Sequence, residues 1–367
     1  MKKILTVLLI NTTILLACSN TPKSYSIPNE IISQTKPSDK NTETLTKDIE
    51  KPEKVSKEVK KELEKPEEIN NKLDNELEKW GKENPEPVEK IPDISVPKTE
   101  TQKDPRYSLE KGTVVSGCES FQLEGKSDKA ILLLHGLGGC PYEMRTLGEY
   151  LNKEGYHISA VRYPGHGTTG KDLSTYSWKD WFGVSEAEYL ELKKKYKTVY
   201  VSGFSTGGTL SLYLAEQYDI ERLVLLSPFI YVSYKWYYGY RPETYLNSPV
   251  GKLLDYIPRK LTLLNINDPV AKKNYIAGNY FSFGATRSAL DLIKNVKKDL
   301  KKVKSPTLII QGRNDDTSDY QSSVYLNENL SSENKKLITL EKSNHVITYD
   351  YEYKKVFEET KAFFENK

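Results

Sequence analysis

Buried strands are predicted where a run of apolar residues has no polar interruption and ends at a turn signal. Residues 129–139 form such a run, because Ala-Ile-Leu-Leu-Leu is followed by His-Gly-Leu-Gly-Gly. Runs of this kind are typical of strands that are covered on both faces of a parallel sheet. Similar runs predict five more strands, within 157–167, 198–208, 221–228, 305–316 and 335–345.

Segments with helical spacing separate these strands. Residues 141–156 bring Met144, Leu147 and Leu151 to one face of a helix that ends at Gly155. Further helices are expected within 177–196, 209–218 and 353–366. Alternating strands and helices predict an α/β fold, with a mostly parallel central sheet and helices on both faces. Ligands bind such sheets at the carboxyl ends of the strands.

The alternation breaks within about 229–296, where aromatic residues are too frequent for an exposed loop. We interpret this segment as an inserted cap over the functional site, with its rings lining an acyl pocket. The alternative is that these rings simply pack a small helical subdomain.

The N-terminal third has a different composition. Residues 1–17 have a positive start, an apolar stretch too short to span a bilayer and a small-residue end, which indicates a signal peptide. Residues 18–104 are rich in Lys, Glu and Pro and predict a disordered tether, because they cannot bury enough apolar surface to fold. The folded α/β domain is therefore expected within 105–367.

Charge and cysteine content exclude several function classes. A formal net charge of +3 gives no basic footprint for nucleic acid. The three cysteines form no CxxC pair and no cluster with histidine, so no metal and no cofactor are expected. Cys118 and Cys140 are either paired in an exported protein or free and buried.

Ser205 is the candidate nucleophile. It lies in Gly-Phe-Ser-Thr-Gly, between a predicted strand and a predicted helix. This arrangement presents a serine hydroxyl at the top of a sheet, and Gly203 and Gly207 permit the crowded backbone. The helix that follows directs its N–H groups toward the same place.

A serine hydroxyl needs a base within hydrogen-bond reach, and the chain has only four histidines. His135 is expected to brace its loop, and His157 begins a strand at the wrong end of the sheet. His166 follows a strand at the correct end but is interpreted as a turn-stabilising residue. His345 follows the last strand and is the predicted base.

The imidazole in turn needs a carboxylate that fixes its tautomer. Asp315, Asp316 and Asp319 all follow the strand within 305–316. Asp315 is the predicted acid, and Asp316 is the alternative. The backbone N–H groups of Leu137 and Thr206 are the predicted oxyanion-hole donors, since each follows a strand at the same edge.

Five segments together resemble the bacterial carboxylesterase and monoacylglycerol lipase branch of the α/β-hydrolases: ILLLHGLGG, YPGHG, GFSTGG, QGRNDD and SNHVITYD. The resemblance covers about residues 118–367. It implies that Ser205, Asp315 and His345 are nucleophile, acid and base, with Leu137 and Thr206 as oxyanion donors. Asn344 departs from the glycine that this branch has before its histidine. A second resemblance is that of residues 15–18 to the lipobox of bacterial lipoproteins, which implies acylation of Cys18.

These features predict a serine hydrolase that cleaves carboxylic esters of short or medium chain, monoacylglycerols included. It would be exported and held by its lipid at a membrane, on the periplasmic or cell-surface face. The same triad also fits a thioesterase, an amidase, or a haloperoxidase-like or C–C hydrolase. The alternative outside enzymes is a surface-displayed binding protein that uses the fold as a scaffold.

Overall fold

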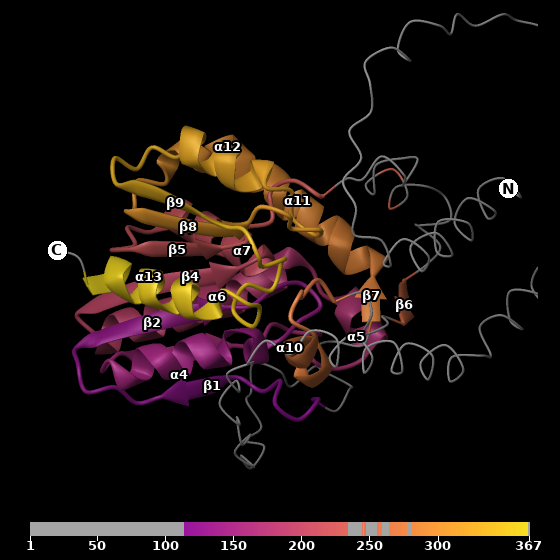
Figure 1. Cartoon of the computed structure of the whole chain (residues 1–367), viewed down its shortest axis with the longest axis horizontal. Helices are drawn as coiled ribbons and strands as arrows, with labels where there is room; N and C mark the ends of the chain where they lie inside the picture. The colour runs from indigo at the N-terminus through magenta and orange to yellow at the C-terminus, as the bar shows by residue number, and fades with distance from the viewer. Residues whose placement is uncertain are drawn as a thin grey trace, which may run out of the picture. The chain divides into compact units, whose positions relative to one another are not determined.

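A computed structural model describes residues 114–233, 244, 246, 255–258, 264–276 and 280–365 of the chain (Figure 1). The predicted signal peptide, Cys18 and the predicted tether lie outside the described residues. Among the described helices, none is long and apolar enough to cross a membrane.

A seven-stranded sheet forms the centre of the described part. Its strand order is β1-β3-β2-β4-β5-β8-β9, and every neighbouring pair is parallel except β1 with β3. The strands are β1 (Phe121–Leu123), β2 (Lys129–Leu134), β3 (His157–Val161), β4 (Thr198–Phe204), β5 (Leu223–Leu226), β8 (Thr307–Gly312) and β9 (Lys335–Leu340). The six strands expected from the apolar runs are therefore present, and the predicted fold class is confirmed.

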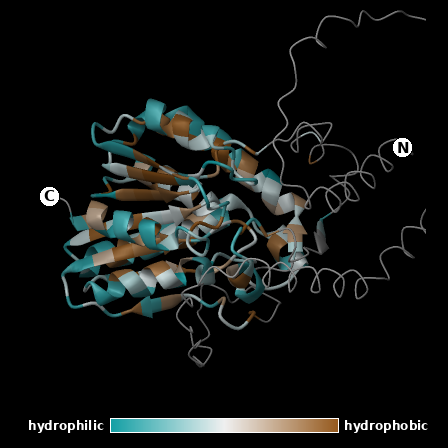
Figure 2. Ribbon diagram, viewed as in Figure 1, coloured by the Kyte–Doolittle hydropathy of each residue, from teal (hydrophilic) through white to brown (hydrophobic). Residues whose placement is uncertain are grey.

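Helices cover both faces of this sheet, so that the apolar strands lie between more polar helical surfaces (Figure 2). One face carries the short helix η3 (Pro141–Met144), α4 (Arg145–Lys153) and α13 (Tyr353–Glu365). The other face carries α5 (Gly170–Thr175), α6 (Trp178–Lys195), α7 (Thr206–Gln217), α11 (Phe283–Asp299) and α12 (Gln321–Asn329).

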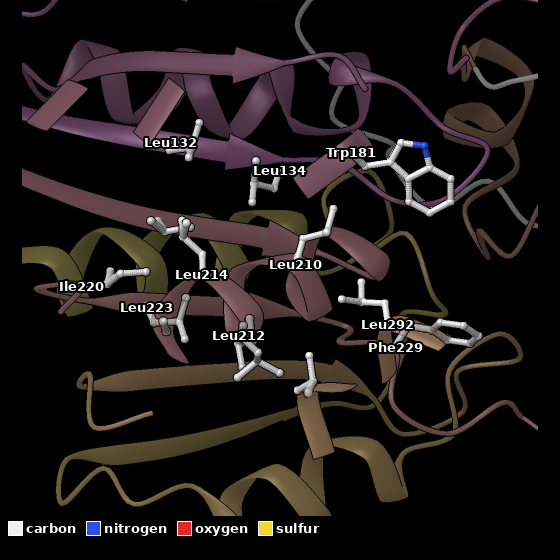
Figure 3. Packing of buried hydrophobic residues seen from close by; sticks show 14 of the residues in the cluster. Leu132, Leu134, Trp181, Leu210, Leu212, Leu214, Ile220, Leu223, Phe229 and Leu292 are labelled. Carbon is white, nitrogen blue, oxygen red and sulfur yellow. The ribbon is translucent and has the colours of Figure 1, made fainter. Parts of the chain in front are cut away.

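Strand β2 shows why the apolar runs have no polar interruption. Ile131 and Leu133 pack toward α4, while Leu132 and Leu134 pack toward α6 and α7. Figure 3 shows Leu132 and Leu134 on the α7 side, in the same cluster as Leu210. Since alternate residues of a strand point to opposite faces, a strand covered on both sides has to be apolar at every position.

The described part of the expected insertion contains short elements of its own and the first part of a helix that belongs to the main core. A two-stranded antiparallel sheet, β6 (Tyr256–Pro258) with β7 (Tyr280–Ser282), and the short helix α10 (Pro269–Asn274) lie between β5 and α11. Helix α11 begins before residue 296 but packs in the main core through Ala289 and Leu292. This helix therefore belongs to the layer that covers the sheet.

Cys118 and Cys140 form a disulfide, with their Cα atoms 5.2 Å apart. The bond fastens the segment before β1 to the loop that follows β2. Val115 adds a second attachment, because its N–H donates to the Gly167 carbonyl at 2.8 Å. The sequence left the pairing of these cysteines open, and the structure resolves it.

Glu216, near the end of α7, is expected to make stability depend on pH. Both of its carboxylate oxygens are shielded and have no hydrogen-bond partner in the described structure. Burial, with the nearby Asp299 charge, raises the pKa of this carboxyl from 4.5 to about 8. The folded protein holds the proton between about pH 4.5 and 8 while the unfolded chain releases it, so stability falls as the pH rises through this range.

Glu216→Gln removes this titration. We expect the variant to match the parent near pH 4.5 and to exceed its free energy of unfolding by about 1 kcal/mol at pH 8.5, a value reduced for partial solvent screening. Urea denaturation at the two pH values measures the difference. An equal effect of the substitution at both pH values would contradict the assignment.

Candidate active site

Ser205 lies in the sharp turn between β4 and α7. Its backbone has φ 53° and ψ −119°, a conformation that L-residues adopt only where the surroundings enforce it. A Cβ atom at Gly203 would lie 2.3 Å from the Gly207 carbonyl oxygen, and one at Gly207 would lie 2.2 Å from the Leu134 carbonyl oxygen. The two glycines of the motif are therefore required by close backbone contact.

Gly203→Ala is expected to lower the free energy of unfolding by about 2 to 3 kcal/mol, because the added methyl group meets backbone atoms that cannot move independently. The matched control is Gly183→Ala in α6, where an added Cβ meets nothing within 4 Å. This control should stabilise the protein by roughly 0.5 to 1 kcal/mol through helix propensity. Urea denaturation of both variants gives the comparison, and equal stabilities would contradict the close-contact argument.

Three side chains from different loops form a hydrogen-bonded chain at the carboxyl edge of the sheet. Ser205 Oγ lies 2.9 Å from His345 Nε2, and His345 Nδ1 lies 2.8 Å from Asp315 Oδ2. All three residues are buried. A serine with this arrangement has a base positioned to take its proton and a carboxylate that orients the base.

The hydrogen-bond partners of the three candidate acids show which of them contacts His345. Asp315 accepts further hydrogen bonds from the Thr317 and Ser318 N–H groups, at 2.8 and 2.9 Å, which fix its carboxylate. Asp316 instead accepts from the Asn344 side-chain amide at 3.0 Å. Asp319 accepts from the Gln321 N–H at the start of α12. Only Asp315 therefore pairs with the histidine in the described structure.

The other three histidines have local partners. His135 Nδ1 lies 2.9 Å from the Gly136 carbonyl, and its Nε2 accepts from the Tyr163 N–H. His157 begins β3 and pairs with Glu124. His166 Nδ1 lies 3.3 Å from the Pro164 carbonyl, and burial lowers the pKa of its ring to about 3. His166 is therefore neutral at physiological pH.

The two expected oxyanion donors, Leu137 and Thr206, follow β2 and β4, which are parallel neighbours in the sheet. Thr206 is the first residue of α7, where backbone N–H groups have no partner within the helix. Leu137 lies in the turn after β2, in which the Gly139 N–H donates to the Gly136 carbonyl and Gly138 has φ +69°. Helix α7 begins directly after Ser205, so the positive end of its dipole lies beside this serine.

The loop that carries His345 is held by residues that the sequence did not identify. The His345 and Val346 N–H groups both donate to the Asn265 carbonyl, at 3.1 and 3.2 Å. The fully buried Asp350 accepts from the N–H groups of Asn344, Asn267, Asp268 and Tyr351. The segment just before α10 thereby anchors the histidine loop.

Asn344 ties the histidine loop to the acid loop. Its side-chain oxygen accepts from the Asp316 N–H at 3.0 Å, and its side-chain amide donates to Asp316 and to Asn267. The departure from glycine at this position therefore adds contacts beside His345. Among the described residues, no cluster of three or more His, Cys, Asp or Glu side chains could hold a metal ion.

Comparisons with known proteins show the family to which the chain belongs. The model of the family Hydrolase_4, described as serine aminopeptidase, S33, matches residues 125–352. The chain belongs to this family of the α/β-hydrolase superfamily. The hydrolase is 30% identical to a thermostable monoacylglycerol lipase of Bacillus sp. (strain H-257), over 70% of this chain and 97% of that protein. It is 28% identical to a carboxylesterase of Bacillus subtilis (strain 168), over 67% and 95%.

Solved structures show the same fold. A structure of the metagenome-derived lipolytic enzymes LipS and LipT matches the hydrolase with a TM-score of 0.62 and 25% identity, covering 68% of this chain and 98% of that chain. A monoacylglycerol lipase from Paleococcus ferrophilus has a TM-score of 0.57 at 22% identity, with 66% and 98% covered. The α/β-hydrolase fold is therefore established for the described domain.

Proposed function

We propose that this hydrolase cleaves carboxylic esters through an acyl-enzyme at Ser205. The observation that carries the proposal is the continuous hydrogen-bonded chain from Ser205 through His345 to Asp315, at the start of a helix. Homologues named as a monoacylglycerol lipase and a carboxylesterase support an ester as the substrate class.

The proposed reaction has two halves. Ser205 Oγ attacks the ester carbonyl while His345 Nε2 takes its proton, and the resulting oxyanion accepts hydrogen bonds from the Leu137 and Thr206 N–H groups. His345 then gives the proton to the leaving alcohol as the carbon–oxygen bond breaks. Water enters, loses a proton to His345 and attacks the acyl group, and the proton returns to Ser205 as the acid leaves.

The substrate class is tested with one acyl group, butyryl, bonded to a leaving group through oxygen, sulfur or nitrogen. We expect the full-length protein to hydrolyse p-nitrophenyl butyrate with a higher kcat/KM than a butyryl thioester or butyryl p-nitroanilide. A series of acyl chain lengths on the same leaving group then sizes the acyl pocket. The family description as a serine aminopeptidase favours amides as the second candidate, and faster turnover of the anilide would select it.

We further propose that the hydrolase is exported and anchored to a membrane through acylated Cys18. The signal-like residues 1–17 support this, and the disulfide between Cys118 and Cys140 is typical of an oxidising compartment. Metabolic labelling with an alkyne fatty acid tests the anchor. Label should be present in the parent protein and lost in Cys18→Ala, and a parent protein that takes up no label would contradict the proposal.

A further inference from the structure

Glu143 is a buried carboxylate beside the proposed reaction centre. It lies in η3, with only 5% of its surface exposed. Its Oε2 accepts from the Gly136 N–H at 2.8 Å, and its Oε1 accepts from the Tyr275 hydroxyl. Burying a carboxylate costs free energy unless such donors compensate it, so these bonds hold the side chain in one position.

The carboxylate lies against both ends of the turn that carries Leu137. At one end it accepts from Gly136. At the other end, a Cβ atom at Gly139 would lie 2.2 Å from the Glu143 carboxyl carbon. The turn between these glycines has one internal hydrogen bond, from the Gly139 N–H to the Gly136 carbonyl. The Glu143 carboxylate therefore restrains both ends of the turn that carries Leu137.

Glu143 also joins this turn to two other parts of the site. Tyr275 directly follows α10, within the insertion between β5 and α11. The backbone carbonyl of Glu143 accepts from the Thr348 hydroxyl at 2.8 Å, and Thr348 lies three residues after His345. Glu143 thus contacts the turn that carries Leu137, the insertion between β5 and α11, and the loop that carries His345.

We propose that Glu143 is a positioning residue for the oxyanion hole and that the Tyr275 hydroxyl couples it to the insertion. The inference rests on the proposed ester hydrolysis, because an oxyanion donor has an effect only if an oxyanion forms. A backbone donor acts only within a narrow range of distance from the developing charge, so a turn that loses its anchor loses rate rather than substrate affinity.

The experiment compares six variants of the full-length protein: Glu143→Ala, Glu143→Gln, Gly139→Ala, the double variant that combines Glu143→Ala with Gly139→Ala, Tyr275→Phe and, as a control, Glu149→Ala. Glu149 is a half-exposed carboxylate on α4 that pairs with Arg145. For each, kcat and KM are measured with p-nitrophenyl butyrate, together with the inhibition constant of a trifluoromethyl ketone. This inhibitor forms a hemiketal oxyanion on the serine, so its affinity reports on the oxyanion hole.

Glu143→Ala should lower kcat about 10- to 100-fold, with KM changed less than about threefold. It should raise the inhibition constant of the trifluoromethyl ketone by a factor similar to the loss of kcat. Glu143→Gln keeps an acceptor for Gly136 and should stay within about fivefold of the parent. Tyr275→Phe should lower kcat about three- to tenfold. Glu149→Ala should leave kcat, KM and the inhibition constant of the ketone unchanged.

Gly139→Ala keeps the proposal falsifiable if Glu143→Ala does not fold. The nearest atoms to its methyl group belong to the Glu143 side chain and not to the backbone, and Gly139 is not among the described glycines with positive φ, so the fold should tolerate the change. The displaced carboxylate should produce the same loss of kcat as Glu143→Ala. Once the carboxylate is gone the methyl has nothing to displace, so the double variant should be no worse than either single variant.

Hydrogen exchange separates failure of this inference from failure of the proposed function. In Glu143→Ala the Gly136 amide loses its acceptor, so peptides covering 135–140 should exchange faster than in the parent, whether or not the protein turns over esters. If the parent hydrolyses no ester, the proposed function fails and the exchange result alone decides the anchoring role. An active parent with unchanged kcat and ketone affinity in Glu143→Ala and Gly139→Ala would overturn the inference.

Discussion

Ser205→Ala should lower kcat for p-nitrophenyl butyrate by about 10⁴- to 10⁶-fold while leaving the fold intact. The loss is large because Ser205 is the proposed covalent nucleophile and its hydroxyl is the group that His345 contacts at 2.9 Å. Alanine removes only that hydroxyl. Steady-state rates, with circular dichroism to verify folding, give the result.

The matched control for this prediction is Ser202→Ala, in β4, the strand that ends directly before Ser205. Ser202 is fully buried, and its hydroxyl has no partner in the described structure. We therefore expect this variant to retain turnover within about twofold, since loss of an unpaired hydroxyl costs no hydrogen bond. Turnover of more than a few per cent in Ser205→Ala would contradict the acyl-enzyme proposal, and equal losses in both variants would indicate a structural effect.

Asp315→Asn is expected to lower kcat by roughly 10³- to 10⁴-fold. The Asp315 carboxylate accepts from His345 Nδ1, which leaves Nε2 free to accept the serine proton. An amide at this position can present an N–H group to Nδ1, so the imidazole then carries its proton on the wrong nitrogen. The pH dependence of kcat/KM should change together with the rate.

Asp316→Asn provides the comparison, because Asp316 pairs with Asn344, whereas Asp315 pairs with His345. We expect its kcat to fall by less than about tenfold, through loosening of the histidine loop alone. A larger loss in Asp316→Asn than in Asp315→Asn would reverse the assignment of the acid.

Most of the sheet was predictable because parallel strands covered on both faces have to be apolar throughout. Strand β1 was missed because three residues at an antiparallel edge give no such run. Helix α12 was also missed, and only three of its residues are buried.

The reacting residues could be placed from the sequence because each follows a strand, and the carboxyl ends of parallel strands share one edge. The residues that hold them could not. Glu143 has the sequence character of a solvent-exposed acid in the first turn of a helix. Its burial depends on Tyr275, which lies 132 residues away. Asp350 is a comparable case, since its partners come from the segment before α10.

The most direct test of the central claim is mass spectrometry of the full-length protein after reaction with a fluorophosphonate, which labels activated serines. We predict one adduct per chain, within the tryptic peptide Thr198–Arg222 and at Ser205 by fragmentation, with none in Ser205→Ala. The adduct should block hydrolysis of p-nitrophenyl butyrate in proportion to its formation. A folded protein that remains unlabelled, or that is labelled at another serine while turnover continues, would contradict the assignment of Ser205 as the nucleophile.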